Sequence, residues 1–113
     1  MRLFAKNTSI LSGEVDCPGD KSISQRAIII GALANQNISI TGFLNGEDPL
    51  STLSALNQIG ADISINNNKV RLNKRELTFS NPSNSIDLGN SGTGMRLIMG
   101  LIAGTGLKAT LIG

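Results

Sequence analysis

Two segments of this sequence are apolar on nearly every helical face, and this feature constrains the fold more than any other. They cover residues 21–34 and 91–103. The first carries Ile23, Ala27, Ile28, Ile29, Ile30, Leu33 and Ala34, and the second carries Met95, Leu97, Ile98, Met99, Leu101 and Ile102. A helix that is apolar all round is normally buried all round. A chain of 113 residues with many polar loops has little to cover two such helices, so we expect it to be part of a larger structure.

The order of apolar and polar stretches predicts an α/β architecture. Three times, a glycine followed by a polar residue opens a helix-like stretch that leads into a strand-like stretch. The helix-like stretches cover residues 21–34, 49–59 and 91–103, and the strand-like stretches cover residues 38–41, 62–65 and 108–111. Residues 63–72 alternate around three asparagines, as a hairpin does. Shorter strand fragments at 12–15 and within 76–85 complete a set of mixed sheets with helices packed on them.

The second helix is predicted to lie on a surface of the molecule. Asp48 suits the N-cap position and Pro49 the first helical position, where its missing N–H costs nothing. Gly60 suits a left-handed end. Four apolar residues recur at about helical spacing, with polar residues on the other faces; they are Leu50, Leu53, Leu56 and Ile59.

Charge and aromatic content argue against a nucleic-acid partner. The 10 Lys and Arg residues exceed the 8 Asp and Glu residues by only two, giving a net charge of +2. The densest basic group is spread along a predicted strand and comprises Lys69, Arg71, Lys74 and Arg75. With three Phe and no Tyr or Trp, the chain has no platform on which bases could stack.

Histidine is absent and Cys17 is the only cysteine, which removes His-based triads and most metal sites from these residues. Cys17 could be a nucleophile helped by Lys21, although a small buried hydrophobe is the commoner role. The longest apolar runs, at 27–34 and 97–104, are too short to span a membrane. Because residues 1–11 also lack the apolar core of a secretory signal, we expect a cytoplasmic protein with no membrane partner.

The start of the first helix has the residue types of an anion site. Lys21 and Ser22 occupy its first turn, and Arg26 follows one turn later near the same side. Free N–H groups and the positive end of the helix dipole attract an anion there. Arginine can hold a phosphate or carboxylate with two parallel hydrogen bonds, while lysine acts as a movable point charge. The alternative is that Lys21 and Arg26 are solvated charges beside a core helix.

A second glycine-rich segment precedes the third helix. Gly89, Gly92 and Gly94 fall within six residues, which lets backbone approach a ligand closely. The segment is not a dinucleotide fingerprint, because Leu97 stands where a further glycine is required. A tight strand-to-helix turn is the alternative. Two such helix starts in one short chain favour a binding site for a polyanionic small molecule.

These two segments resemble a known family. They are similar to the two N-terminal signatures of the 3-phosphoshikimate 1-carboxyvinyltransferase (EPSP synthase) family. The residues that carry this resemblance are Pro18-Gly19-Asp20-Lys21-Ser22-Ile23-Ser24-x-Arg26 and Gly89-Asn90-Ser91-Gly92-Thr93-Gly94-Met95-Arg96. The resemblance spans residues 13–113, and the sister family that acts on UDP-N-acetylglucosamine is less similar.

The resemblance implies both a reaction and a fold. Family members condense shikimate 3-phosphate with phosphoenolpyruvate and release phosphate, without a metal or cofactor. Their fold, an inside-out α/β barrel type, has two domains built from βαβαββ units that close over the substrates. Here it would be incomplete: residues 1–17 would supply a strand of the second domain, and residues 18–113 the first part of the N-terminal domain. The complete enzyme is expected to be a monomer.

The resemblance also assigns residues to substrates. Lys21 would contact both substrates, and Ser22 and Arg26 would hold shikimate 3-phosphate. Asn90 and Gly92 would border phosphoenolpyruvate. No catalytic residue is expected within this chain, because the acid–base carboxylates of the family lie beyond the position of Gly113.

Two positions depart from the family pattern. Gln25 stands where His or Asn is usual, and Leu97 replaces a common Pro; neither is expected to be a direct ligand. Two other functions remain open on the residues alone. The chain could be a non-catalytic anion-binding module that assembles with a partner chain, or an inactive fragment.

Overall fold

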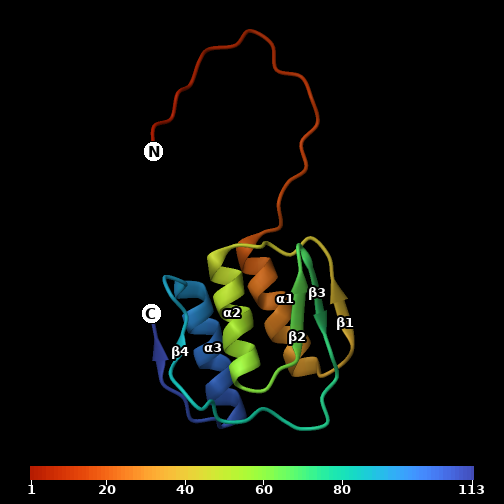
Figure 1. The fold of residues 1–113 in the computed structure, drawn as a ribbon, viewed down its shortest axis with the longest axis vertical. Coiled ribbons are helices and arrows are strands. Elements are labelled where there is room, and N and C mark those ends of the chain that lie inside the picture. Colours follow the sequence, from red (N-terminus) through yellow and green to blue (C-terminus); the bar gives the residue numbers. More distant parts are fainter.

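The computed structural model describes all residues from Met1 to Gly113 and contains three helices and five strands. The elements in chain order are α1 (Lys21–Ala34), β1 (Ile38–Ile40), α2 (Glu47–Gln58), β2 (Ile63–Asn66), β3 (Lys69–Leu72), β4 (Ile86–Asp87), α3 (Gly92–Thr105) and β5 (Leu111–Ile112). The three helices run side by side in the same direction (Figure 1). α2 contacts β2 of one sheet and β4 of the other, so the helices form a layer between two sheets.

The larger sheet is antiparallel, with strand order β1-β3-β2. Ile38 and Ile63 both pair with Leu72, which therefore lies at the centre of the sheet. Val70 and Leu72 point into the core, whereas Lys69 and Arg71 are exposed, which is the alternation that the sequence predicts. The predicted hairpin is confirmed, and Asn67 has the positive φ of 54° that its two-residue turn requires.

The smaller sheet consists of β4 and β5, which pair in parallel, with Ile86 opposite Leu111. Parallel neighbours need a crossover connection, and α3 provides it. The strand expected at 108–111 is thus present, but it begins three residues later and ends one residue later than expected. The strand fragment expected within 76–85 is not found there; regular pairing begins only at Ile86, whose side chain is fully buried.

α1 and α3 are each covered on one side only. Ile28 of α1 and Ile98 of α3 are completely buried in the hydrophobic core. Ile23, Ile30 and Met99 keep 68%, 64% and 54% of their surface exposed. This confirms the expectation from the sequence that a chain of 113 residues cannot cover two such apolar helices, because it supplies no second layer over them. The exposed apolar faces agree with the expectation of a larger structure.

Residues 1–20 form neither helix nor strand. This segment leaves the folded body next to the start of α1 and extends away from it (Figure 1). The short strand expected at 12–15 is absent because no other strand of the chain lies beside it to share hydrogen bonds. Cys17 is exposed, so it is not a buried hydrophobe here.

α2 begins two residues earlier than the sequence predicts. Gly46 is its N-cap residue and makes no side-chain capping bond, so the expected capping role of Asp48 is wrong. Asp48 instead lies in the first turn. The C-terminal prediction is confirmed: Gly60 follows Ile59 with a φ of +96°, and its N–H donates to the carbonyl of Asn57.

The basic group at residues 69–75 is not a continuous surface. Arg71 lies exposed on β3, whereas Arg75 follows the strand and turns inward. Its guanidinium donates to the carbonyls of Ala32 (2.9 Å) and Gly60 (3.2 Å), at the ends of α1 and α2. It also lies 4.1 Å from the centre of the Phe79 ring. Arg75 is therefore a structural residue that ties two helix C-termini together.

The helices are short. The longest have 14 residues, and none combines the length and apolar character that a membrane span requires.

Candidate functional site

The N-termini of all three helices meet at one end of the molecule (Figure 1). Two side-chain contacts join them. Lys21 in the first turn of α1 contacts Asp48 in the first turn of α2, and Gln25 of α1 contacts Ser91, the N-cap residue of α3. The two segments singled out in the sequence therefore lie together, although 66 residues separate Gln25 from Ser91.

The start of α1 combines unpaired amides with a positive side chain. Asp20 caps the helix, and its carboxylate accepts a 2.7 Å bond from the N–H of Ile23. The N–H groups of Lys21 and Ser22 have no acceptor within the chain, as expected for a first helical turn. The Lys21 ammonium lies 2.9 Å from Oδ2 of Asp48, the chain's one ion pair. This pair was not predicted, because Asp48 was expected to cap its own helix.

Arg26 lies on the next turn of α1. Its side chain is exposed and makes no hydrogen bond or ion pair within the chain. The structure therefore places Arg26 on the same helix as Lys21 and Ser22 but shows no contact that holds the guanidinium beside them. An unengaged arginine next to a helix N-terminus can take up a phosphate or carboxylate.

The start of α3 presents backbone to solvent. Ser91 is 2% exposed, and its Oγ accepts a 3.1 Å bond from the N–H of Gly94. Asn90 and Gly92 are exposed beside it, and the Gly92 N–H has no acceptor within the chain. Gly92 does not have the positive φ of a left-handed turn; among the glycines of this segment only Gly89 does, at +55°. A conformational need for glycine therefore does not explain Gly92.

Gln25 is the important residue that sequence reasoning undervalued. It is completely buried, and its Nε2 lies within hydrogen-bond distance of Thr52 Oγ1 (2.9 Å), Ser91 Oγ (2.9 Å) and the Asp48 carbonyl (3.2 Å). A signal was present in the sequence. Residues 25, 28, 29 and 32 form the buried stripe of α1, so a glutamine in that stripe must find partners inside the protein.

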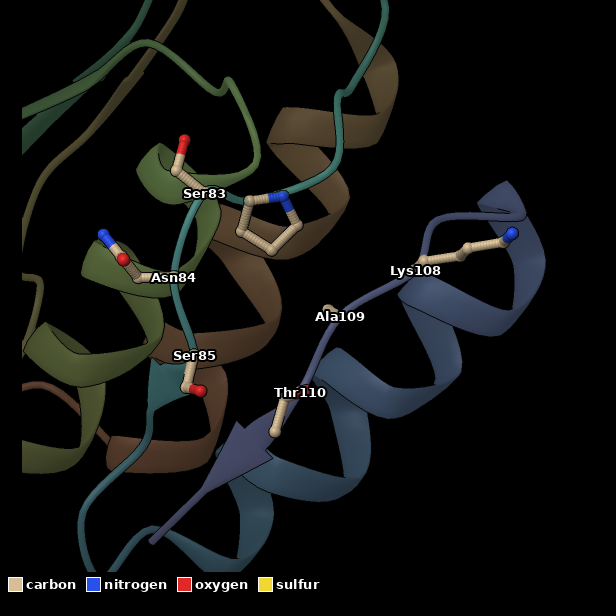
Figure 2. Close-up of a pocket in the computed structure, with 7 residues that line it drawn as sticks. Ser83, Asn84, Ser85, Lys108, Ala109 and Thr110 are labelled. Carbon is tan, nitrogen blue, oxygen red and sulfur yellow. The ribbon is translucent and has the colours of Figure 1, made fainter.

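A groove lies elsewhere on the molecule, where the segments leading into β4 and β5 separate (Figure 2). Figure 2 shows Ser83, Asn84 and Ser85 on one side and Lys108, Ala109 and Thr110 on the other. This groove is near the C-terminal end of α3 and contains none of the predicted site residues. Lys108 is its only charged residue, so we do not assign it the chemistry expected at the helix N-termini.

The fold and this end of the molecule suit a class of protein that binds anionic small molecules at clustered helix N-termini. The comparison with known families is more specific. Residues 5–113 match the family described as EPSP synthase (3-phosphoshikimate 1-carboxyvinyltransferase), and the chain belongs to that family.

Individual relatives agree. The chain is 39% identical to the 3-phosphoshikimate 1-carboxyvinyltransferase of Thermoanaerobacter sp. (strain X514), a match covering 100% of this chain and 27% of that protein. It is 45% identical to the Paracoccus denitrificans (strain Pd 1222) protein of the same name, over 98% of this chain and 26% of that one. The solved EPSP synthase of Acinetobacter baumannii superposes with a TM-score of 0.72 at 40% identity, covering 80% of this chain and 21% of that one. The chain thus spans about a quarter of the length of these curated relatives.

Proposed function

We propose that the chain is the substrate-binding N-terminal part of an enzyme that transfers the enolpyruvyl group of phosphoenolpyruvate to shikimate 3-phosphate, releasing phosphate. One observation carries the proposal: the two signature segments lie at neighbouring helix N-termini, joined through Gln25 and Ser91. The names of the relatives support the same reaction. The product is 5-enolpyruvylshikimate 3-phosphate, and the complete protein works without a cofactor, as a monomer in the cytoplasm.

Each site residue has a role in this proposal. Lys21 contacts both substrates through its ammonium, which Asp48 holds at the start of α1 while about half of the side chain stays exposed. Ser22 and Arg26 hold shikimate 3-phosphate, one through a hydroxyl and the other through a guanidinium fork that suits a phosphate or a carboxylate. Asn90 and Gly92 border phosphoenolpyruvate, and the exposed backbone of Gly92 permits its close approach.

These residues bind and orient substrates but do not transfer protons. Three carboxylates near the helix starts already have partners: Asp20 caps α1, Asp48 pairs with Lys21, and Asp87 accepts from the N–H of Gly89. Glu47 lies exposed in the first turn of α2. We therefore assign acid–base catalysis to carboxylates in the remainder of the complete protein. Residues 18–113 belong to its N-terminal domain, and residues 1–17 contribute a strand to the second domain.

The test uses the complete protein that contains this chain. Phosphate release is measured with both substrates and with each substrate alone, and the organic product is identified by mass spectrometry. The proposal expects phosphate and 5-enolpyruvylshikimate 3-phosphate in equal amounts, only when both substrates are present. Binding of both substrates without turnover would instead support the non-catalytic module, and binding of neither would support the inactive fragment.

A further inference from the structure

Gln25 sits where the three helix starts converge. Its amide nitrogen carries two hydrogens and reaches three acceptors, one on the α2 backbone, one on Thr52 of α2 and one on Ser91 of α3. Its Oε1 is buried without a partner. The unpaired carbonyl costs part of the stability that the nitrogen contacts contribute. These contacts join the start of α1 to the starts of α2 and α3.

Gly94, in the first turn of α3, faces the same cluster. A Cβ added at Gly94 would lie 2.7 Å from Ser91 Oγ, 2.7 Å from Thr52 Oγ1 and 3.1 Å from Gln25 Nε2. The space that a side chain would need at this position is therefore filled by the polar atoms that Gln25 joins. The two closest of these atoms, Ser91 Oγ and Thr52 Oγ1, are the ones that the Gln25 amide holds in place, so the cluster fits only because residue 94 has no side chain.

We propose that Gln25 is a positioning residue whose amide, fitted against Gly94, fixes the start of α3 relative to the first turns of α1 and α2. Its contact with Ser91 fixes the position of the neighbouring Asn90 and Gly92. Its contact with the Asp48 carbonyl fixes the first turn of α2, and the Asp48 carboxylate in that turn holds Lys21. The two substrate-binding segments thus keep a fixed separation. This inference rests on the proposed function for its catalytic consequence but not for its geometry.

The close packing of the Gln25 cluster around Gly94, here called the matched fit, predicts how substitutions of Gln25 and Gly94 should combine. Gln25→Asn shortens the side chain by one methylene and withdraws the amide from Ser91 and Thr52. Gly94→Ala places a methyl group against three polar side-chain atoms, and these atoms cannot all move away. In the double variant the withdrawn amide no longer holds Ser91 Oγ and Thr52 Oγ1, which lie closest to the added methyl group. Both hydroxyls can then turn aside, so the double variant restores a filled cluster.

The experiment compares the complete protein with both single variants and the double variant. Thermal unfolding and the KM for phosphoenolpyruvate are measured for each. Two controls make the same residue changes elsewhere. Gln58→Asn alters an exposed glutamine whose amide meets only Ser54 Oγ, at 3.4 Å. Gly100→Ala adds a Cβ that has nothing within 4 Å. Neither control lies at the helix starts.

Each single variant is expected to lower Tm by a few degrees and to raise KM for phosphoenolpyruvate by about tenfold or more, because small misplacements of binding groups are costly. The double variant is expected to return to within about threefold of the parent KM and to regain most of the lost Tm. Additive losses of Tm in the double variant would overturn the matched fit. A fall in Tm with KM unchanged would overturn the positioning role. A parent protein without turnover would refute the proposed function, and the Tm cycle would still decide the matched fit.

Discussion

The ammonium nitrogen of Lys21 lies 2.9 Å from Oδ2 of Asp48, 27 residues further along the chain. The Lys21 side chain is 51% exposed and that of Asp48 is 24% exposed, so water screens the pair. Pairs of this kind contribute only about 0–1 kcal/mol to folding. We therefore interpret the contact as one that holds Lys21 in place at the start of α1.

Asp48→Asn tests this interpretation. The substitution removes the counter-charge but keeps the shape, so we expect little change in Tm and a roughly three- to tenfold loss of affinity for shikimate 3-phosphate. Combined with Lys21→Ala, it should add nothing to the loss that Lys21→Ala causes alone. Titration of the four proteins with shikimate 3-phosphate measures the coupling. Tighter binding by the Asp48 variant would show that the carboxylate only competes with the substrate.

Gly92→Ala tests the approach of phosphoenolpyruvate. Within the chain an added Cβ would meet only the mobile end of Arg96, at 3.3 Å from Nη1, so the fold should tolerate it. The resemblance to the family implies that the inhibitor glyphosate would occupy the phosphoenolpyruvate site. Because it is slightly longer than the substrate, it should lose more affinity than the substrate does. Overpacking of about 1–3 kcal/mol corresponds to roughly five- to 150-fold. Equal shifts in the glyphosate inhibition constant and in KM would contradict the steric role of Gly92.

Arg75→Ala tests the tie between the ends of α1 and α2. Loss of two charge-assisted bonds and of the contact with Phe79 should lower the free energy of unfolding by roughly 2 kcal/mol, allowing for partial exposure. Arg71→Ala, on the exposed face of β3, is the matched control and should stay within about 0.5 kcal/mol of the parent. Urea unfolding measures both. Equal changes in the free energy of unfolding for the two substitutions would contradict the structural role of Arg75.

The exposed faces of α1 and α3 predict the behaviour of the chain by itself. Ile23, Ile30 and Met99 are more than half exposed, so the 113-residue chain should bind a hydrophobic dye and melt with little cooperativity. It should also show no transferase turnover, because it lacks the groups that complete the site. A cooperative melt without dye binding, or turnover with contaminating enzyme excluded, would contradict these expectations.

The sequence predicts most of the elements because its local signals agree with the packing. α1 begins at Lys21 as expected because Asp20 supplies a true N-cap, and the hairpin forms where asparagines turn between alternating strands. The error at Asp48 has a different origin. Its local context favours a cap, but a lysine from another helix competes for its carboxylate, and only the tertiary structure shows that contact.

The candidate site was predicted residue by residue but not as an arrangement. Lys21, Ser22, Asn90 and Gly92 are predicted from residue types, motifs and the family resemblance, and their roles stay predictions. The structure adds that their helix starts adjoin. The role of Gln25 could not be read from α1 alone. Its partners lie on α2 and α3, and periodicity identifies a buried face without identifying what meets it.

The most direct test of the account is calorimetric titration of the complete protein with shikimate 3-phosphate. The parent is compared with Lys21→Ala, Arg26→Ala and the control Arg71→Ala. Each of the first two removes a charge-assisted contact of about 1.5–3 kcal/mol, so affinity should fall roughly ten- to hundredfold, while the control binds as the parent does. Lys21→Ala should also raise KM for phosphoenolpyruvate, more than Arg26→Ala does. Unchanged affinity in both variants would return Lys21 and Arg26 to the status of solvated surface charges and contradict the assignment of the site.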